Sequence, residues 1–531
     1  MKGRIFGGRK PVALPNEIDV LIVGAGPVGA TLANLCGRLG VRTLMIDKLA
    51  EIQTQPRALV LDNEALRILQ LAGLDDASFA RMTIPEARLH SPIFGQFARM
   101  NTRGTLDGHS MLISFFQPEL EHKLHDALAH YPSVQVARPI EWLDTNEEQD
   151  GCTVSLRLPD GTTHIVRAQY VVGADGASSP TRQALGIAFA GSSYREDWLI
   201  VDALNIPKEI DHVEFLCDPR RPVAHIPGPG GRQRWEFMLQ PNETAEKMLQ
   251  EETIKELLSP WADLHQIVIE RSAVYRFHAL TATQFRCGRT LLVGDAAHVM
   301  PPFIGQGLVS GLRDVANLAW KLAWVTQHRA DERILDSYLI ERRAHVRAMS
   351  RLAQWMGKLI MPRNRVAAFF THGVARLMTL TPGLRSLIVD IKMKPKNRFA
   401  RGLFSSRRFV DHFVHGDHLV QGRLSKTPGV IQRSDDVLGQ HLQLIGIEVD
   451  PLAHLSAAQR DTWHELGGMT LKITASASAS ETGWVDIDNS FGALGLHRGW
   501  IVAVRPDKVV IADGKPNQAD AIVKAVAKLM R

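Results

Sequence analysis

The sequence has few cysteines, and their positions favour neither a metal site nor a disulfide framework. The four cysteines of the 531 residues are Cys36, Cys152, Cys217 and Cys287, and no two of them form a CxxC pair. Zinc sites and redox-active disulfides are commonly built from such closely spaced pairs. We therefore expect no metal, and the isolated thiols favour a reducing, cytoplasmic location.

The chain also lacks a concentration of charge of one sign and an uninterrupted apolar run of membrane-spanning length. The formal net charge is +6, but Lys and Arg are spread along the chain, which argues against a nucleic-acid partner. Residues 20–37 carry no charge, yet Gly24, Gly26, Pro27 and Gly29 interrupt them. These residues predict a strand that turns into a helix, and neither a signal peptide nor a transmembrane segment.

Two basic segments, residues 335–359 and 365–378, are predicted to be amphipathic helices. Such helices usually bury their apolar stripe against other protein. We expect them to pack on the rest of the chain or on a second copy in a homodimer, and contact with a membrane surface is the alternative.

The first motif predicts a dinucleotide site. Residues 19–23 form a buried-strand pattern, Gly24, Gly26 and Gly29 make a G-x-G-x-x-G turn, and residues 30–39 have helical composition. A second strand, residues 42–46, ends in Asp47. Glycines in this arrangement let backbone N–H groups approach a pyrophosphate at the helix N-terminus, and the acid accepts hydrogen bonds from a ribose.

Two later segments each place a buried strand before a turn with an aspartate. Residues 170–182 contain Asp175-Gly176, and residues 289–298 contain Gly294-Asp295, followed by the Pro- and Gly-rich loop 301–307 and a helix over 310–324. Small residues in such loops let the backbone lie against a flat ring. Taken singly, each segment is also compatible with a simple strand-to-helix turn.

The three motifs in this order resemble those of the class A FAD-dependent aromatic monooxygenases, the group that includes p-hydroxybenzoate hydroxylase. The resemblance implies that Asp295 holds the ribityl chain, that loop 301–307 lies beside the isoalloxazine, and that Asp175 and Arg182 serve FAD and nicotinamide binding. Arg57 and Gln117 match positions near the ribityl-pyrophosphate region, although by residue type alone the alternatives are a surface charge for Arg57 and a helix N-terminal residue for Gln117. The predicted cofactor-binding residues are Gly24, Gly26, Pro27, Gly29, Asp47, Lys48, Arg57, Gln117, Asp175, Gly176, Arg182, Gly294, Asp295, Ala296, Pro301, Gly305 and Gly307.

The expected fold class is mixed α/β and α+β. A discontinuous Rossmann-like FAD-binding domain comprises residues 1–86, 117–182 and 284–395, and a substrate-binding sheet domain comprises residues 87–116 and 183–283. Residues 396–421 form a linker. The β/α order of residues 422–531 resembles a thioredoxin-like domain, but no cysteine lies beyond Cys287, so we expect it to be structural or oligomer-forming.

Further stretches narrow the resemblance to the 3-(3-hydroxyphenyl)propionate/3-hydroxycinnamate hydroxylases. They are residues 62–67, 217–222, 234–238, 305–314 and 341–345. Asp47 stands where many relatives have Glu, and residues 302–304 also depart from some relatives, which leaves the shape of the ring pocket open. The family chemistry implies a phenolic acid, O₂ and NADH (or NADPH) as substrates, with hydroxylation ortho to the phenolic hydroxyl in aromatic catabolism. A hydroxylase of another phenol and a flavin oxidase are the alternatives.

The substrate site is predicted from residue types on the expected sheet. Arg221 or Arg234 is a candidate for binding a carboxylate, because the planar guanidinium supports two charge-assisted hydrogen bonds. His225 or Tyr275 is a candidate for removing the phenol proton. Surface or core roles are the alternatives for all four residues. His298, beside the third motif, is expected to be packed rather than catalytic. Because no second G-x-G-x-x-G lies between a strand and a helix, NAD(P)H is expected to bind only transiently.

Overall fold

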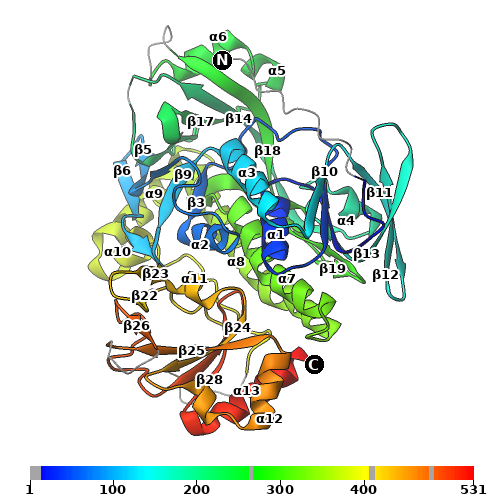
Figure 1. Cartoon of the computed structure of the whole chain (residues 1–531). Helices are drawn as coiled ribbons and strands as arrows, with labels where there is room; N and C mark the ends of the chain where they lie inside the picture. Colours follow the sequence, from blue (N-terminus) through cyan, green and yellow to red (C-terminus); the bar gives the residue numbers. More distant parts are fainter. Residues whose placement is uncertain (1–12, 208, 262–266, 406–412, 477–482) are drawn as a thin grey trace.

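The computed structural model describes residues 13–207, 209–261, 267–405, 413–476 and 483–531. The parts of the predicted domains that fall on other residues lie outside this description. Figure 1 shows three layers: a central α/β domain, a sheet above it and a smaller α/β domain below it. The predicted mixed α/β class with a sheet inserted into a Rossmann-like domain is confirmed.

The central domain is built on parallel strands that alternate with helices. Its sheet has the order β10-β2-β1-β13-β12-β11, with β20 beside the end of β13. Helices α1, α3 and α7 pack on one face and share one apolar core. The elements are β1 (Glu17–Val23), α1 (Pro27–Arg38), β2 (Thr43–Ile46), α3 (Gln117–Ala127), β10 (Val134–Ala137), β11 (Glu141–Glu148), β12 (Gly151–Arg157), β13 (Thr163–Gly173), α4 (Pro180–Ala184), β19 (Arg286–Cys287), β20 (Thr290–Leu292) and α7 (Gly307–Thr326).

The upper sheet has eight strands, in the order β21-β18-β14-β17-β16-β15-β5-β6. Along β17 the side chains alternate, so that Trp235 and Phe237 lie in an apolar core on one face while Arg234 and Glu236 lie on the other. The strands are β5 (Glu86–Ser91), β6 (Gly95–Asn101), β14 (Phe189–Leu204), β15 (Val213–Leu216), β16 (Val223–Pro227), β17 (Gln233–Met238), β18 (Val268–Ala282) and β21 (His298–Val299).

Several short elements complete these two layers. The strands β3 (Val60–Asp62), β9 (Leu112–Phe115) and β4 (Arg81–Thr83) form a separate small sheet, although residues 112–115 were expected to contribute to the substrate sheet. The others are α2 (Asn63–Leu71), β7 (Thr105–Leu106), β8 (His109–Ser110), α5 (Ala245–Met248) and α6 (Glu251–Leu258).

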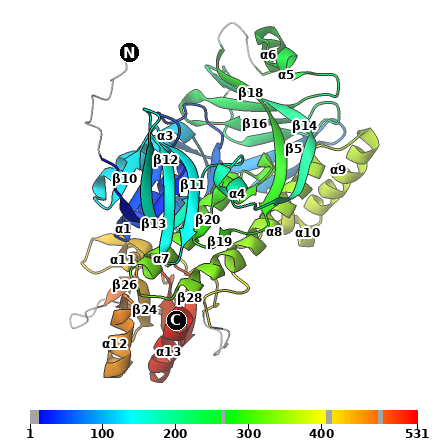
Figure 2. The ribbon, with the colours of Figure 1, turned by 90° about the vertical axis from the view of Figure 1, so that its right-hand side faces the viewer.

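Three helices follow α7, of which the first two agree closely with the expected basic helices and the third was not predicted. They are α8 (Asp336–Ile360), α9 (Arg365–Leu380) and α10 (Pro382–Val389). Figure 2 shows α9 and α10 at the side of the molecule. Both helices contact β6. Their outer surface carries a group of exposed apolar side chains, which comprises Val366, Phe369, Phe370, Val374, Leu377, Leu380, Leu384 and Leu387. No helix in the described ranges is long and apolar enough to cross a membrane.

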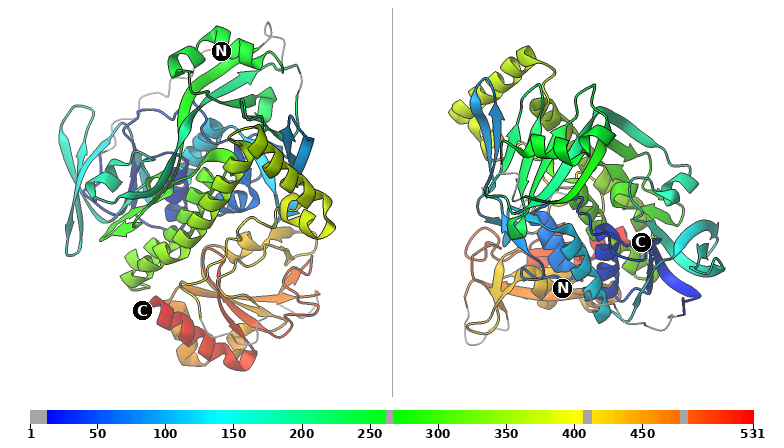
Figure 3. Two further views of the ribbon diagram at one scale, coloured as in Figure 1. Left: turned by 180° about the vertical axis from the view of Figure 1, so that it is seen from behind. Right: turned by 90° about the horizontal axis from the view of Figure 1, so that it is seen from above.

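The C-terminal domain lies at the opposite end of the molecule from the β14–β18 sheet (Figures 1 and 3). A parallel β24-α12-β25 unit is followed by the antiparallel pair β27-β28 and a final helix, which is the expected order. The elements are β22 (Arg423–Ser425), β23 (Ile431–Arg433), α11 (Ser434–Leu438), β24 (Leu442–Ile447), α12 (Ala457–Glu465), β25 (Gly468–Thr474), β26 (Trp484–Asp486), β27 (Ile501–Val504), β28 (Val510–Gly514) and α13 (Ala519–Met530).

Buried ion pairs join this domain to the central one. The carboxylate of Glu341 on α8 accepts hydrogen bonds from Arg505 Nη1 at 2.6 Å and from Lys321 Nζ at 2.9 Å, and all three side chains are fully buried. The two cations hold the pKa of Glu341 well below its ordinary value despite its burial. On α2, Arg67 pairs with Asp435 at 2.6 Å. The two domains are therefore fixed to each other by charge as well as by a shared apolar core.

Candidate active site

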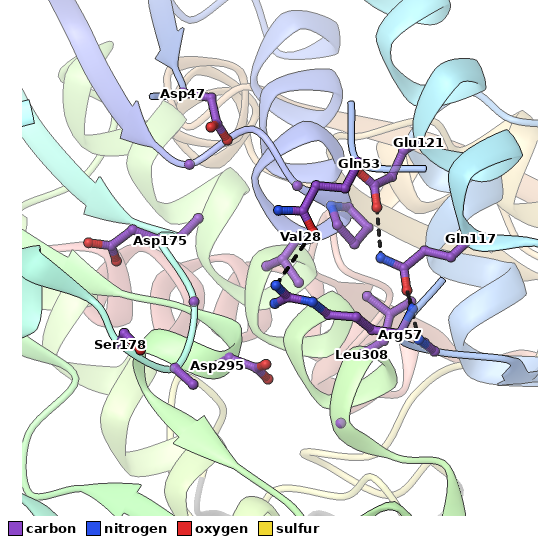
Figure 4. A pocket seen from close by; sticks show the side chains of 18 of the residues that line it. Val28, Asp47, Gln53, Arg57, Gln117, Glu121, Asp175, Ser178, Asp295 and Leu308 are labelled. Carbon is purple, nitrogen blue, oxygen red and sulfur yellow. Dashed lines mark hydrogen bonds between the residues drawn. The ribbon is translucent and has the colours of Figure 1, made fainter. Parts of the chain in front are cut away.

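A cavity of about 720 Å³ lies between the central domain and the upper sheet. Ligand pockets typically enclose about 300–1,000 Å³, so the cavity has the size of a cofactor site. Figure 4 shows Asp47, Asp175 and Asp295, which come from three separate turns, around it. The predicted residues that line it are Gly24, Gly26, Pro27, Asp47, Lys48, Arg57, Gln117, Asp175, Gly176, Arg234, Asp295, Gly305 and Gly307.

The turn before α1 requires its glycines. Gly24 has φ +105°, and a Cβ added there would lie 2.4 Å from the carbonyl oxygen of Ala174. A Cβ on Gly29 would lie 2.0 Å from the Gly24 oxygen, whereas one on Gly26 would meet open space. No side chain caps the N-terminus of α1. Its first N–H groups are therefore free to bind an anion in the cavity.

Asp47 supports this turn from the end of β2. Its Oδ2 accepts a hydrogen bond from Ala25 N at 2.8 Å, and its Oδ1 accepts one from Leu49 N at 2.9 Å. Each oxygen keeps further acceptor capacity toward the cavity, which is what binding of ribose hydroxyls requires. Lys48 lines the cavity beside it.

Gln117 positions the chain that carries Arg57. Its Oε1 accepts hydrogen bonds from the backbone N–H groups of Arg57 at 2.9 Å and Ala58 at 2.7 Å, and its Nε2 donates to Glu121 at 2.7 Å. Figure 4 shows the Arg57 guanidinium extending into the cavity. Gln117 thus both lines the cavity and holds a neighbouring cation in place.

Arg234 secures the same segment from the upper sheet. It pairs with Asp202 at 2.6 and 2.9 Å, and it donates to the carbonyl oxygens of Pro56 and Arg57, each at 2.8 Å. These four bonds leave one of the five N–H groups of a guanidinium. Two parallel bonds to a substrate carboxylate are therefore not available, so the structure does not support the predicted substrate role of Arg234.

The second motif forms a loop at one wall of the cavity. Asp175 accepts hydrogen bonds from Ser179 Oγ at 2.5 Å and from Thr181 N at 2.9 Å, which fixes the start of α4. Arg182 is buried outside the cavity lining, 3.7 Å above the ring of Phe189, and donates to Ala177 O at 3.0 Å. Arg182 therefore supports this loop from behind, whereas the prediction placed it at the cofactor.

The third motif contributes a half-buried carboxyl group and a second helix N-terminus. Asp295 lines the cavity, and burial raises its pKa. Gly307 begins α7, which no side chain caps, and a Cβ there would meet open space. Gly294, Ala296 and Pro301, also predicted at the cofactor, lie behind the lining.

His298 is fully buried behind the third motif. Its Nε2 lies 2.6 Å from Asp314 Oδ2, and Arg342 donates to the other oxygen of Asp314 at 2.9 Å. This contact network agrees with the expectation that His298 is packed.

Three of the predicted substrate-site residues lie away from the cavity. His225 is 2% exposed on the opposite face of the sheet, where it stacks on Trp235 at 4.4 Å. Tyr275 is 38% exposed and accepts a hydrogen bond from Arg271. Arg221 pairs with Glu243 at 2.5 and 2.9 Å. None of these three side chains lines the cavity. His225 points to the opposite face of the sheet and Arg221 is held in an ion pair, whereas Tyr275 lies on the cavity-facing side of β18 but outside the lining.

The prediction missed Glu236, which lines the cavity at the end formed by the upper sheet. It lies two residues after Arg234 on β17, so it shares that residue's face. The alternation of Arg and Glu with Trp235 and Phe237 is the sequence signal that points to it.

The residues present fit FAD. Two uncapped helix N-termini and a glycine turn suit the pyrophosphate, and Asp47 suits the adenosine ribose. The half-buried Asp295 has no hydrogen-bond partner within the described residues. Within the same residues, no group of three or more His, Cys, Asp or Glu side chains is arranged to hold a metal ion.

Comparisons with known families and folds agree with this assignment. The model of the FAD binding domain family matches residues 17–353, and that of the HcaD C-terminal domain matches residues 416–529. The fold is similar to that of the flavin-dependent monooxygenase PieE, at a TM-score of 0.79 with 20% identity over 97% of this chain and 100% of that one. Aklavinone-11 hydroxylase gives 0.75 with 22% identity over the same shares. The chain is a flavoprotein aromatic hydroxylase.

The curated relatives define the family more narrowly. A 3-(3-hydroxy-phenyl)propionate/3-hydroxycinnamic acid hydroxylase of Burkholderia vietnamiensis is 38% identical over 96% of this chain and 94% of that protein. The corresponding enzyme of Escherichia coli K12 is 31% identical over 98% and 96%. The chain belongs to this family of hydroxylases, as its motifs predicted, and FAD is confirmed as its cofactor.

Proposed function

We propose that the protein hydroxylates 3-(3-hydroxyphenyl)propionate or 3-hydroxycinnamate ortho to the phenolic hydroxyl. One oxygen atom of O₂ replaces a ring hydrogen as a hydroxyl group, the other leaves as water, and NAD(P)H supplies the two electrons. The substrate names come from the relatives. The observation that carries the proposal is a single cavity that runs from the G-x-G-x-x-G turn to the upper sheet.

The chain's own residues bind, orient and shield the reactants. FAD, when bound, accepts electrons from NAD(P)H and activates O₂. The α1 N-terminus and Asp47 would bind its nucleotide part, while Arg57 is held in place by Gln117 and Arg234. At the other end, Ile226, Val299 and Met300 give the ring an apolar environment that excludes water. The predicted transient binding of NADH remains part of the proposal. Comparing reaction rates with NADH and with NADPH tests which of the two the enzyme prefers as reductant.

The decisive experiment follows NAD(P)H oxidation and product mass with and without 3-(3-hydroxyphenyl)propionate. We expect the phenol to stimulate NAD(P)H oxidation and to gain one oxygen atom. A hydroxylated product that contains no ¹⁸O after reaction under ¹⁸O₂ would contradict oxygen insertion from O₂. Release of H₂O₂ in equal amount to NAD(P)H, with no hydroxylated product from any phenol, would indicate an oxidase.

A hydroxylase of a phenol without a carboxylate is the second candidate. It is favoured by one observation: Arg221 and Arg234, the predicted carboxylate ligands, are committed to Glu243 and Asp202. Phenol and resorcinol should therefore be tested beside the two acids. A higher kcat/KM for phenol or resorcinol than for both acids would support this candidate.

We also propose a homodimer in a reducing cytoplasm. The exposed apolar side chains of α9 and α10 support association, since monomers rarely expose such continuous apolar surface.

The cytoplasm is favoured because that compartment keeps thiols reduced, and all four cysteines are free. Light scattering and cell fractionation test these two points.

A further inference from the structure

Glu236 is a buried carboxyl group at the end of the cavity where the ring of the substrate is expected. It is 7% exposed and lies in the middle of β17. On the two neighbouring strands, its direct partners in register are Ile200 and Ala224, which offer no polar side chain. Its carboxyl group therefore lines the cavity with no polar side chain directly opposite it on either neighbouring strand.

Neither oxygen of Glu236 has a hydrogen-bond or ion-pair partner in the part of the chain that the structure describes. Two other carboxyl groups of this region differ in this respect, because Asp202 pairs with Arg234 and Glu121 accepts a hydrogen bond from Gln117. Burying a carboxylate without a partner is costly. A side chain of this kind in a binding cavity is suited to a ligand that donates a hydrogen bond.

The charged groups around Glu236 come from three strands. Burial raises its pKa, Arg234 on β17 and Arg271 on β18 lower it, and Asp202 on β14 raises it, with burial the largest effect. Tyr275 lies behind Arg271 and accepts its hydrogen bond, and His225 on β16 lies on the opposite face of the sheet. Both nearby arginines are already bound to Asp202 and to Pro56 O, and neither forms an ion pair with Glu236.

We propose that Glu236 accepts the phenolic proton of the substrate. The phenol O–H bond breaks as the O–H bond of the Glu236 carboxyl group forms, so charge moves onto the phenolic oxygen and makes the ring more electron-rich. The propionate of the substrate is not a suitable partner, because two carboxylates repel each other. This inference rests on the proposed hydroxylation of a phenol, and it assigns the proton acceptor for which His225 and Tyr275 were the predicted candidates.

The test compares the wild type with Glu236→Gln, and Glu270→Gln is the matched control because Glu270 pairs with Arg232 on the same sheet, outside the cavity lining. A general base typically contributes about 10²–10⁴-fold, so Glu236→Gln should lower kcat for hydroxylation by that factor while FAD content is retained. More acidic fluorinated phenols and higher pH should restore a large part of the rate. A merely structural role would not produce this rescue.

A second measurement needs no turnover. The ¹⁹F chemical shift of bound 3-(4-fluoro-3-hydroxyphenyl)propionate reports the hydrogen bond made by the neighbouring hydroxyl, and it should move toward the value of the free neutral phenol in Glu236→Gln but not in Glu270→Gln. If the wild type hydroxylates a phenol while Glu236→Gln keeps its rate or its ¹⁹F shift, the role of Glu236 is overturned and the function stands. If the wild type neither binds nor hydroxylates any phenol, the proposed function fails, and the inference fails with it.

Discussion

Replacing Glu341 tests whether charge holds the C-terminal domain in place. In Glu341→Gln, Lys321 loses its carboxylate partner and keeps Asn317 Oδ1 at 2.7 Å, whereas Arg505 keeps Asp507 at 2.8 Å. Removing one partner of a buried ion pair costs about 3–5 kcal/mol, because the other charge stays buried and uncompensated. A single domain is typically stable by only about 5–15 kcal/mol, so the loss should be large.

The pH dependence follows from Lys321. Burial lowers its pKa to about 8 even with Glu341 beside it, and without Glu341 the pKa should fall further. A lysine with a lowered pKa releases its proton in the folded state before the unfolded chain does, and stability rises with pH over that interval. In the variant this rise begins at lower pH, so the deficit relative to the wild type should shrink as the pH rises toward about 8.

The assay is urea unfolding followed by tryptophan fluorescence, since Trp320 and Trp324 lie beside this junction. Lys321→Met in the Glu341→Gln background should recover part of the loss, which a double-mutant cycle measures. Glu332→Gln is the control, because Glu332 is 53% exposed in a surface pair and should change stability by about 0–1 kcal/mol. A cost for Glu341→Gln no greater than that of the control, with no coupling to Lys321, would refute the reasoning.

Three further changes address the cofactor site and the outer helices. Gly24→Ala should abolish FAD retention, because its Cβ would lie 2.4 Å from Ala174 O, and a purified variant with a full flavin absorbance spectrum would contradict the turn's role. Asp295→Ala should weaken FAD retention and hydroxylation together, and normal flavin content with normal turnover would argue against its assignment. Leu377→Glu on α9 should convert a dimer to a monomer in light scattering, whereas Leu494→Glu, at an equally exposed position of the C-terminal domain, should leave the mass unchanged.

The sequence predicted the turns, strands and helices that depend on interactions between residues close together in the chain. The turn at Gly24, the strands before Asp175 and Asp295, and the long basic helix α8 follow from glycine conformation, buried-strand patterns and helical periodicity. These features need no knowledge of distant residues, and the structure shows them at the expected positions.

Which predicted residues are free to bind a substrate depends on tertiary partners that the sequence does not reveal. Arg221 meets Glu243, and Arg234 meets Asp202 and the backbone at Pro56, a residue 178 positions away. Residue type suggested free arginines, and only the tertiary contacts show that they are engaged. His225 lies away from the cavity for a different reason. Its strand was predicted correctly, but the sequence did not show which face of the sheet meets the cavity.

Helix α7 links two regions that sequence boundaries suggest are separable. Its first residue, Gly307, opens on the cofactor cavity, and near its other end Lys321 and Trp324 contact Glu341 and the backbone of Leu466. At 1.5 Å per residue, its 20 residues span roughly 30 Å. The C-terminal domain therefore contacts one end of the helix whose other end lines the flavin pocket. Exchanging it between related hydroxylases should require exchanging the facing surface of α7 as well.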